Sequence, residues 1–229
     1  DARAKLRARG PDFGFYQRLF ERPFAIGAPY SANLTLDGTS DGREALEVDL
    51  NLGATHLRAS GVIGDFPSYR DTQLTLAATV DDLASIGAFL NARLPATALS
   101  IEGDIEVTQA GRVTLAGLVA NAAGVEATLS GTLNTYPELD DIDLTLDAST
   151  ESLARSSREL QGPALGEVPA SLHAAMHGSV NDLVFDALAA EVGGSRMQTI
   201  DGSLKIAESG LHSDLHLAVD IDSLARLFA

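Results

Sequence analysis

The chain has 229 residues, of which 45% are hydrophobic, a composition too apolar for an intrinsically disordered protein. Its formal net charge of −16 disfavours nucleic acid and anionic lipid headgroups as direct partners. Because there is no cysteine, disulfides and thiolate metal sites are excluded, and no apolar run approaches the roughly 18 residues that a transmembrane helix needs.

The N-terminal segment combines alternating cations with the only cluster of aromatic residues. The cations are Arg3, Lys5, Arg7 and Arg9, and the cluster comprises Phe13, Phe15, Tyr16, Leu19, Phe20 and Phe24. We interpret the cluster as a first helix that docks on its own sheet. The alternative is a contact with a preceding unit of a longer chain or with a membrane-proximal element.

Short sequence patterns recur at spacings of 70 and 71 residues. One series comprises Leu83-Ala84-Ser85-Ile86, Leu153-Ala154-Arg155-Ser156 and Leu224-Ala225-Arg226-Leu227, and another comprises Ser60-Gly61-Val62, Ser130-Gly131-Thr132 and Asp201-Gly202-Ser203. A fixed period of this length predicts an elongated array of tandem repeats. We place repeat 1 at about 12–81, repeat 2 at about 82–151, repeat 3 at about 152–222 and the start of a repeat 4 at 223–229. We expect the chain to be a fragment of a longer array.

The second repeat predicts one short helix followed by four strands. Asp81 or Asp82 can cap a helix, apolar residues recur at helical spacing up to Leu90, and Pro95 prevents its continuation. Apolar and polar residues then alternate over 99–107, less cleanly over 113–119, and again over 125–133 and 142–148, with turns at 110–111 and 121–124. Sequential strands with short turns favour an antiparallel meander, and the first and third repeats follow the same pattern.

Alternation with period two places the apolar side chains of every strand on one face. The predicted lining of that face comprises Leu34, Leu36, Leu46, Val48, Leu50, Leu57, Ile63, Leu74, Leu76, Leu99, Ile101, Ile105, Val107, Val125, Leu129, Leu133, Ile142, Leu144, Leu146, Leu172, Met176, Ile200, Leu204, Leu215 and Leu217. Three short helices would cover about 450 Å² of a face of roughly 1,500 Å². We therefore expect the sheet to curl into an elongated groove with an apolar lining; the alternative is a closed, sandwich-like core.

The pattern resembles the repeats of AsmA-like proteins, a group similar to the repeating β-groove modules of bridge-like lipid transfer proteins. The resemblance rests on the Leu-Ala helix starts, on Ser130-Gly131-Thr132-Leu133 and on Asp143-Leu144-Thr145-Leu146-Asp147, and it extends from Asp12 onward. It implies a periplasmic segment of an inner-membrane-anchored protein of Gram-negative bacteria. It also implies that the groove holds or conducts phospholipid acyl chains in support of the outer envelope, and it implies no catalytic residue.

Several residues could be interpreted as metal-binding, catalytic or glycosylation sites, but each has a simpler structural interpretation. His173 and His177, like His212 and His216, have the four-residue spacing that binds zinc on a helix, yet here they fall on strands, where that spacing is about 13 Å. We interpret the acidic run Asp140, Asp141, Asp143 and Asp147 as a solvated ladder rather than a calcium site, and Ser195 as part of a turn after two glycines. Asn33-Leu34-Thr35 matches the glycosylation sequon, but we assign it no function.

These observations predict a non-enzymatic lipid-binding groove without metal or cofactor. The expected partners are phospholipid acyl chains, the neighbouring repeats of a longer protein and an envelope protein. The alternative is a structural or chaperone-like scaffold in outer-membrane biogenesis that binds polypeptide through its groove or through sheet edges near residues 31–37 and 213–221.

Overall fold

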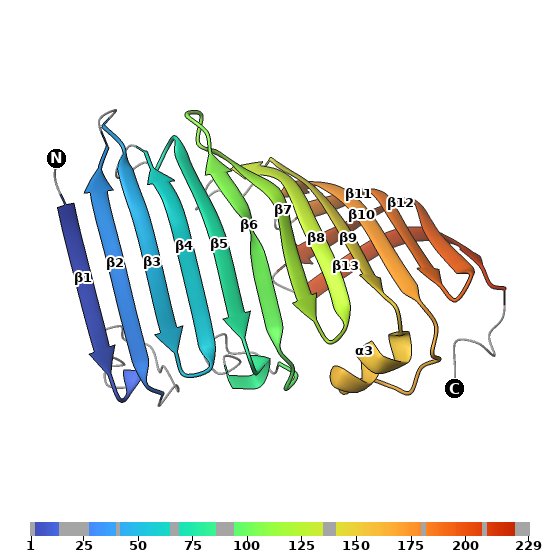
Figure 1. The fold of residues 1–229 in the computed structure, drawn as a ribbon. Coiled ribbons are helices and arrows are strands. Elements are labelled where there is room, and N and C mark those ends of the chain that lie inside the picture. Colours follow the sequence, from blue (N-terminus) through green and yellow to red (C-terminus); the bar gives the residue numbers. More distant parts are fainter. Residues whose placement is uncertain are drawn as a thin grey trace. The chain divides into compact units, whose positions relative to one another are not determined.

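The computed structural model describes residues 3–13, 28–39, 42–64, 69–85, 94–134, 141–179, 182–207 and 210–222. These residues are mostly β and contain thirteen strands, whose order in the sheet follows the order of the sequence (Figure 1). The arrangement is the predicted antiparallel meander. The chain divides into two compact units, residues 1–105 and 106–229, which are described in turn.

In the first unit, the first five strands pair with their neighbours in the sheet without register shifts. They are β1 (Arg3–Gly10), β2 (Tyr30–Gly38), β3 (Glu44–Leu52), β4 (Thr55–Ile63) and β5 (Thr72–Val80), and β6 (Leu99–Val107) follows. The sequence analysis assigned no strand to Arg3–Gly10, so β1 is an addition. Its small apolar residues, Ala4 and Ala8, gave only a weak strand signal.

The second unit continues the meander but contains register shifts. Its elements are β7 (Arg112–Ala122), β8 (Val125–Asn134), β9 (Ile142–Thr150), α3 (Leu153–Glu159), β10 (Ala170–Ser179), β11 (Asp182–Val192), β12 (Ser195–Ala207) and β13 (Gly210–Asp220). The shifts lie between Leu115 and Leu118 in β7, between Ala175 and Met176 in β10, and between Thr199 and Asp201 in β12. Such irregularities bend a strand and interrupt its side-chain alternation.

Two tight turns lie where the sequence predicted them. Ala123 and Gly124 have φ values of 52° and 72° between β7 and β8, and Gly193 and Gly194 have values of 55° and 91° between β11 and β12. Two consecutive residues with positive φ are typical of the hairpin turns whose twist matches that of the flanking strands. The turn interpretation of the segment before Ser195 is therefore confirmed.

The helix predicted at Leu153 is α3, and it lies at the ends of strands. Ser152 caps it by accepting a hydrogen bond from the amide of Arg155 at 3.1 Å. The Ser156 hydroxyl lies 2.8 Å from that of Thr150, the last residue of β9, and α3 is placed below the ends of β8 and β9 in Figure 1. This helix packs at the rim of the sheet.

The other predicted helices are described only in part. Leu83, Ala84 and Ser85 are helical, and the side chain of Asp82 accepts a hydrogen bond from the amide of Ala84 at 2.9 Å, as expected of a cap. The remaining residues of that predicted helix lie outside the described residues. So do the helices predicted near the N-terminus and from residue 223.

Candidate functional site: the apolar faces of the sheet

In the first unit, the strand register brings apolar residues into rows on one face. One row runs from Leu6 on β1 through Leu34, Val48 and Ala59 to Leu76 on β5. Directly opposed residues of antiparallel strands share a face. The register therefore gathers nine of the predicted lining residues on one surface, the unit 1 apolar face: Leu34, Leu36, Leu46, Val48, Leu50, Leu57, Ile63, Leu74 and Leu76.

A side-chain hydrogen bond fixes the orientation of β6. The hydroxyl of Thr75, which lies on the polar face of β5, donates to the carboxylate of Asp104 at 2.6 Å. Asp104 therefore lies on the polar face as well. Because side chains alternate along a strand, Leu99, Ile101, Ile105 and Val107 point to the opposite, apolar side, as predicted.

In the second unit, a comparable row crosses five strands. It comprises Leu118, Leu129, Leu146, Ala174 and Leu188. The predicted lining residues that share this unit 2 apolar face are Val125, Leu129, Leu133, Ile142, Leu144, Leu146, Leu172 and Met176.

The last predicted lining residues lie on β12 and β13. The side chains of Ile200, Leu204, Leu215 and Leu217 are outside the described part of the structure. Ile200 sits within the register shift between Thr199 and Asp201, where the alternation that predicted its face is broken. The backbone of Leu215 opposes Gly202, and that of Leu217 opposes Thr199.

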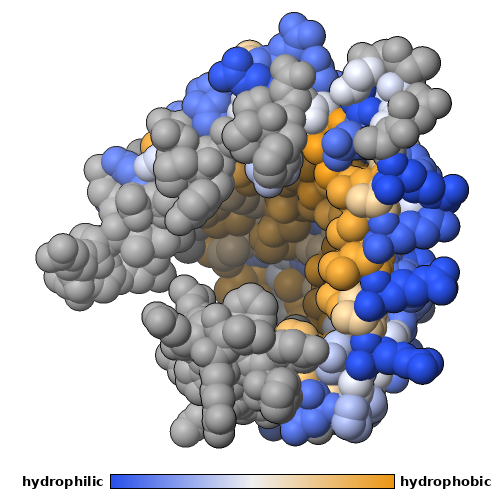
Figure 2. Space-filling view, turned by 90° about the vertical axis from the view of Figure 1, so that its left-hand side faces the viewer, coloured by the Kyte–Doolittle hydropathy of each residue, from blue (hydrophilic) through white to orange (hydrophobic). Residues whose placement is uncertain are grey.

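The apolar faces remain partly exposed. Among the predicted lining residues described, Leu46 and Ile142 are buried, with exposed fractions of 9% and 6%, and the others are intermediate. No large side chain of the described residues is fully buried. Figure 2, seen from the β1 end, shows hydrophobic atoms on one side of the strands nearest the viewer and hydrophilic atoms on the other side.

Two glycines occupy positions in these faces where a side chain would collide with the neighbouring strand. Gly61 has a φ of 151°, and a Cβ placed on it would lie 2.0 Å from the carbonyl oxygen of Gln73 on β5. Gly131 has a φ of 130°, and its Cβ would lie 2.1 Å from the carbonyl oxygen of Asp143 on β9. Each faces a leucine across the ladder, Leu74 or Leu144. A side chain at either position would force two backbones apart.

The polar face carries two pairs of histidine and aspartate side chains in contact. His173 Nδ1 lies 2.7 Å from a carboxylate oxygen of Asp147, and His177 Nδ1 lies 2.7 Å from one of Asp186. All four side chains are about half-exposed, so the histidines lie on the polar face as predicted. The described residues contain no group of three or more side chains suited to hold a metal ion. His216 is exposed, and the side chain of His212 is not described.

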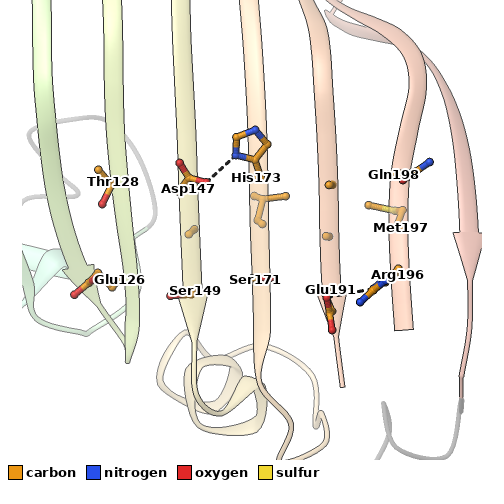
Figure 3. Close-up of a pocket in the computed structure, with 14 residues that line it drawn as sticks. Glu126, Thr128, Asp147, Ser149, Ser171, His173, Glu191, Arg196, Met197 and Gln198 are labelled. Atoms are coloured by element: carbon orange, nitrogen blue, oxygen red, sulfur yellow. Dashed lines mark hydrogen bonds and ion pairs between the residues drawn. The ribbon is translucent and has the colours of Figure 1, made fainter. Parts of the chain in front are cut away.

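A shallow depression of about 400 Å³ crosses β8 to β12 beside His173 (Figure 3). Two of its acidic residues have partners within it: His173 contacts Asp147, and Arg196 Nε lies 3.4 Å from a carboxylate oxygen of Glu191. Solvated contacts of this kind contribute little to stability individually. The depression is best described as part of the polar ladder.

Asp49, on the polar face of β3, has contacts with three neighbouring side chains. Asn51 Nδ2 donates to it at 2.9 Å, and His56 Nε2 and Arg58 Nε lie at 3.4 and 3.5 Å. Desolvation raises the pKa of Asp49, but the hydrogen bond and charge of His56, with the contacts from Asn51 and Arg58, outweigh it and hold the pKa below its usual value. The ionised carboxylate thus stabilises the fold above the usual carboxyl pKa, and this contribution is lost as the pH falls through the lower, folded value.

The other singled-out residues have structural contacts. Asp141 forms an ion pair with Arg112, and Asp143 opposes His177 across the strands; Asp140 lies outside the described residues. The buried Ser195 hydroxyl accepts a hydrogen bond from the amide of Asp222 at 3.2 Å. Asn33 is exposed on β2.

Of the N-terminal aromatic cluster, Phe13 is described. Its ring contacts that of Tyr30 edge-on, with centroids 5.5 Å apart. Phe15, Tyr16, Leu19, Phe20 and Phe24 lie outside the described residues.

The sheet edges differ from those predicted. Residues 31–37 lie in β2, which pairs with β1 on one side and β3 on the other, so the prediction of an edge there was wrong because β1 was not foreseen. Residues 213–221 include most of β13, the last strand in the order.

No family model, curated protein or solved structure matches the chain with significance. The resemblance to AsmA-like proteins therefore stays a prediction. Within the described residues, no helix combines the length and apolar character that crossing a membrane requires.

Proposed function

We propose that the chain is a non-enzymatic lipid-binding segment whose apolar faces hold phospholipid acyl chains. The observation that carries the proposal is the partial exposure of the leucine rows on both units. Exposed apolar patches of this extent are uncommon on monomers and mark binding surfaces. An acyl chain is the simplest occupant, because the rows offer methyl and methylene groups without a fixed polar anchor.

Acyl chains fit this surface energetically. Each buried CH₂ contributes about 0.8 kcal/mol, so burying a dozen methylenes would outweigh the ordering of the lipid tail. Leucine, isoleucine and valine side chains give a dry lining that does not fix the position of the tail along it. Charged headgroups would stay in water beside the sheet.

The proposal extends to repeats and location. β4, β8 and β12 begin at Thr55, Val125 and Ser195, a spacing that supports tandem units of about 70 residues. We propose that these units belong to an AsmA-like protein, periplasmic and tethered to the inner membrane, in which neighbouring repeats and an envelope protein continue a curled groove for lipid transport to the outer envelope.

The test compares adjacent residues on opposite faces of β8. Leu129→Asp places a charge on the unit 2 apolar face, whereas Ser130→Asp places the same charge on the polar face. Protein purified from a bacterial host should carry phospholipid at defined stoichiometry in native mass spectrometry. We expect Leu129→Asp and Leu144→Asp to lose that lipid and Ser130→Asp to keep it, because an acyl chain does not pack against a carboxylate.

Far-UV circular dichroism checks that each variant keeps its strands, and the milder Leu129→Ala is the substitute for a variant that does not. A lipid-free wild-type mass, with a cooperative melt and no gain in melting temperature from added lipid, would contradict the proposal. It would mean that the apolar faces close on themselves in solution.

A further inference from the structure

The helix α3 and the segment that follows it lie at one end of the unit 2 apolar face. Thr150, the last residue of β9, follows Leu146 and Ala148 at alternate positions, so its side chain points to the apolar side. The hydroxyl of Ser156 on α3 lies 2.8 Å from that of Thr150. The helix therefore lies on the apolar side of the sheet, where the strands end and the face meets water.

Backbone hydrogen bonds hold the segment after α3 against the helix. The amide of Ala154 donates to the carbonyl oxygen of Gly166 at 3.1 Å. At the other end of the segment, the amide of Gly162 donates to the carbonyl oxygen of Ser157 at 2.7 Å. Because both ends of residues 162–166 are fixed beside the helix, a pocket between them is preformed, which lowers the cost of ordering a ligand.

A pocket of about 340 Å³ lies between the helix and this segment. Its apolar lining residues are Ala154, Pro163, Ala164 and Leu165, and Arg158 and Glu167 add one charge of each sign. Binding sites for small ligands commonly combine an apolar lining with a few charged or polar groups that orient the ligand. The charges here suit a ligand that carries both signs.

The two charged side chains are accessible to such a ligand. Arg158 Nη2 lies 3.8 Å from Oε1 of Glu167, which is longer than a hydrogen bond, and both side chains are largely exposed. The Ser152 hydroxyl donates to the other carboxylate oxygen, Oε2. A loose, solvated ion pair contributes little to stability, so a ligand can separate Arg158 from Glu167 at low cost.

We infer that this pocket is a subsite for the headgroup of a zwitterionic phospholipid of the ethanolamine type, with the phosphate at Arg158 and the ammonium at Glu167. The inference rests on the proposed binding of acyl chains to the unit 2 apolar face. A guanidinium matches the geometry of a phosphate, and a carboxylate pairs with an ammonium. An anionic headgroup, by contrast, would meet the carboxylate of Glu167 on a molecule of net charge −16.

The first test supplies phosphatidylethanolamine and phosphatidylglycerol with identical acyl chains in equal amounts, and native mass spectrometry measures which lipid the protein retains. We expect the wild type to prefer the ethanolamine lipid by about threefold or more, because the glycerol headgroup lacks an ammonium for Glu167. E167Q keeps an oxygen acceptor for Ser152 but removes the charge, and it should abolish the preference. The matched control E159Q makes the same change in net charge on α3 outside the pocket, and it should keep the preference.

The second test uses glycerophosphoethanolamine, which is the same headgroup without acyl chains. In an NMR titration of the full chain, it should shift the amide signals of Arg158 and Glu167. R158Q should weaken this binding by about threefold or more, because a charge-assisted hydrogen bond to the phosphate is lost. R155Q makes the same change in net charge outside the pocket and should bind like the wild type.

The two tests separate this inference from the proposed function. Equal retention of both lipids by the wild type, or an equal loss of preference in E159Q and E167Q, would overturn the headgroup subsite and leave the binding of acyl chains standing. Shifts caused by glycerophosphoethanolamine without any retained lipid would support the pocket as a site for the free headgroup compound and contradict the binding of acyl chains. The absence of both would overturn both.

Discussion

At the scale of single residues, the sequence predicted the side of the sheet on which most apolar side chains lie. Leu34, Leu50 and Leu146 face the apolar side because alternation is a local property of an extended backbone. The exclusion of a side chain at Gly61 and Gly131 was not predictable, since the contact that excludes it comes from the neighbouring strand.

Gly61→Ala tests this close approach. The added methyl would lie 2.0 Å from the carbonyl oxygen of Gln73, so β4 and β5 must separate, and we expect the free energy of unfolding to fall by about 3 kcal/mol. Urea denaturation measures the loss. Gly42→Ala is the control: Gly42 has a φ of 84° but nothing within 4 Å of the added Cβ, so only backbone strain of about 1 kcal/mol is expected. Equal losses would show that strand crowding at Gly61 contributes nothing.

At the scale of elements, patterns with strong local signals were predicted and the others were not. The helix start at Leu153 and the turn at Gly124 were predicted, because helix starts and turns depend on a few adjacent residues. β1 was missed because Ala4, Ala8 and Gly10 give it little apolar character. The register shift at Thr199 was also missed, because it depends on pairing with β13.

The cap of α3 gives a prediction at this scale. The Ser152 hydroxyl accepts from the Arg155 amide and also donates to Glu167. Ser152→Ala should lower the free energy of unfolding by about 1 kcal/mol, measured by thermal denaturation and by faster hydrogen exchange at the Arg155 amide. Ser152→Asn retains an acceptor and should cost much less. If the two variants lost the same stability, the cap would not be the cause.

At the scale of the whole molecule, the partly exposed leucine rows of the two units are the main feature. Among the predicted lining residues whose side chains are described, Leu46 and Ile142 are buried and the others are intermediate. Because part of this apolar surface is already in contact with water in the folded protein, the urea m-value and the heat-capacity change should be smaller than those of a protein of equal length that buries its apolar side chains.

Urea titration and calorimetry of the lipid-free protein check this expectation. Added phospholipid should raise the melting temperature as its concentration rises, because a ligand that binds only the folded state stabilises it by mass action. An m-value equal to that of a compact protein of the same length would mean that the apolar faces are covered in solution.

The sequence by itself determined the β-rich class, the meander and the two-faced character of the strands, because alternation, turns and caps are set within a few neighbouring residues. Only the tertiary structure decided that β2 pairs with β1, that a side chain at Gly61 or Gly131 would collide with the neighbouring strand, and that the leucine rows stay partly exposed. Each of these depends on which strand lies beside which, and burial is a property of neighbours that are distant along the chain.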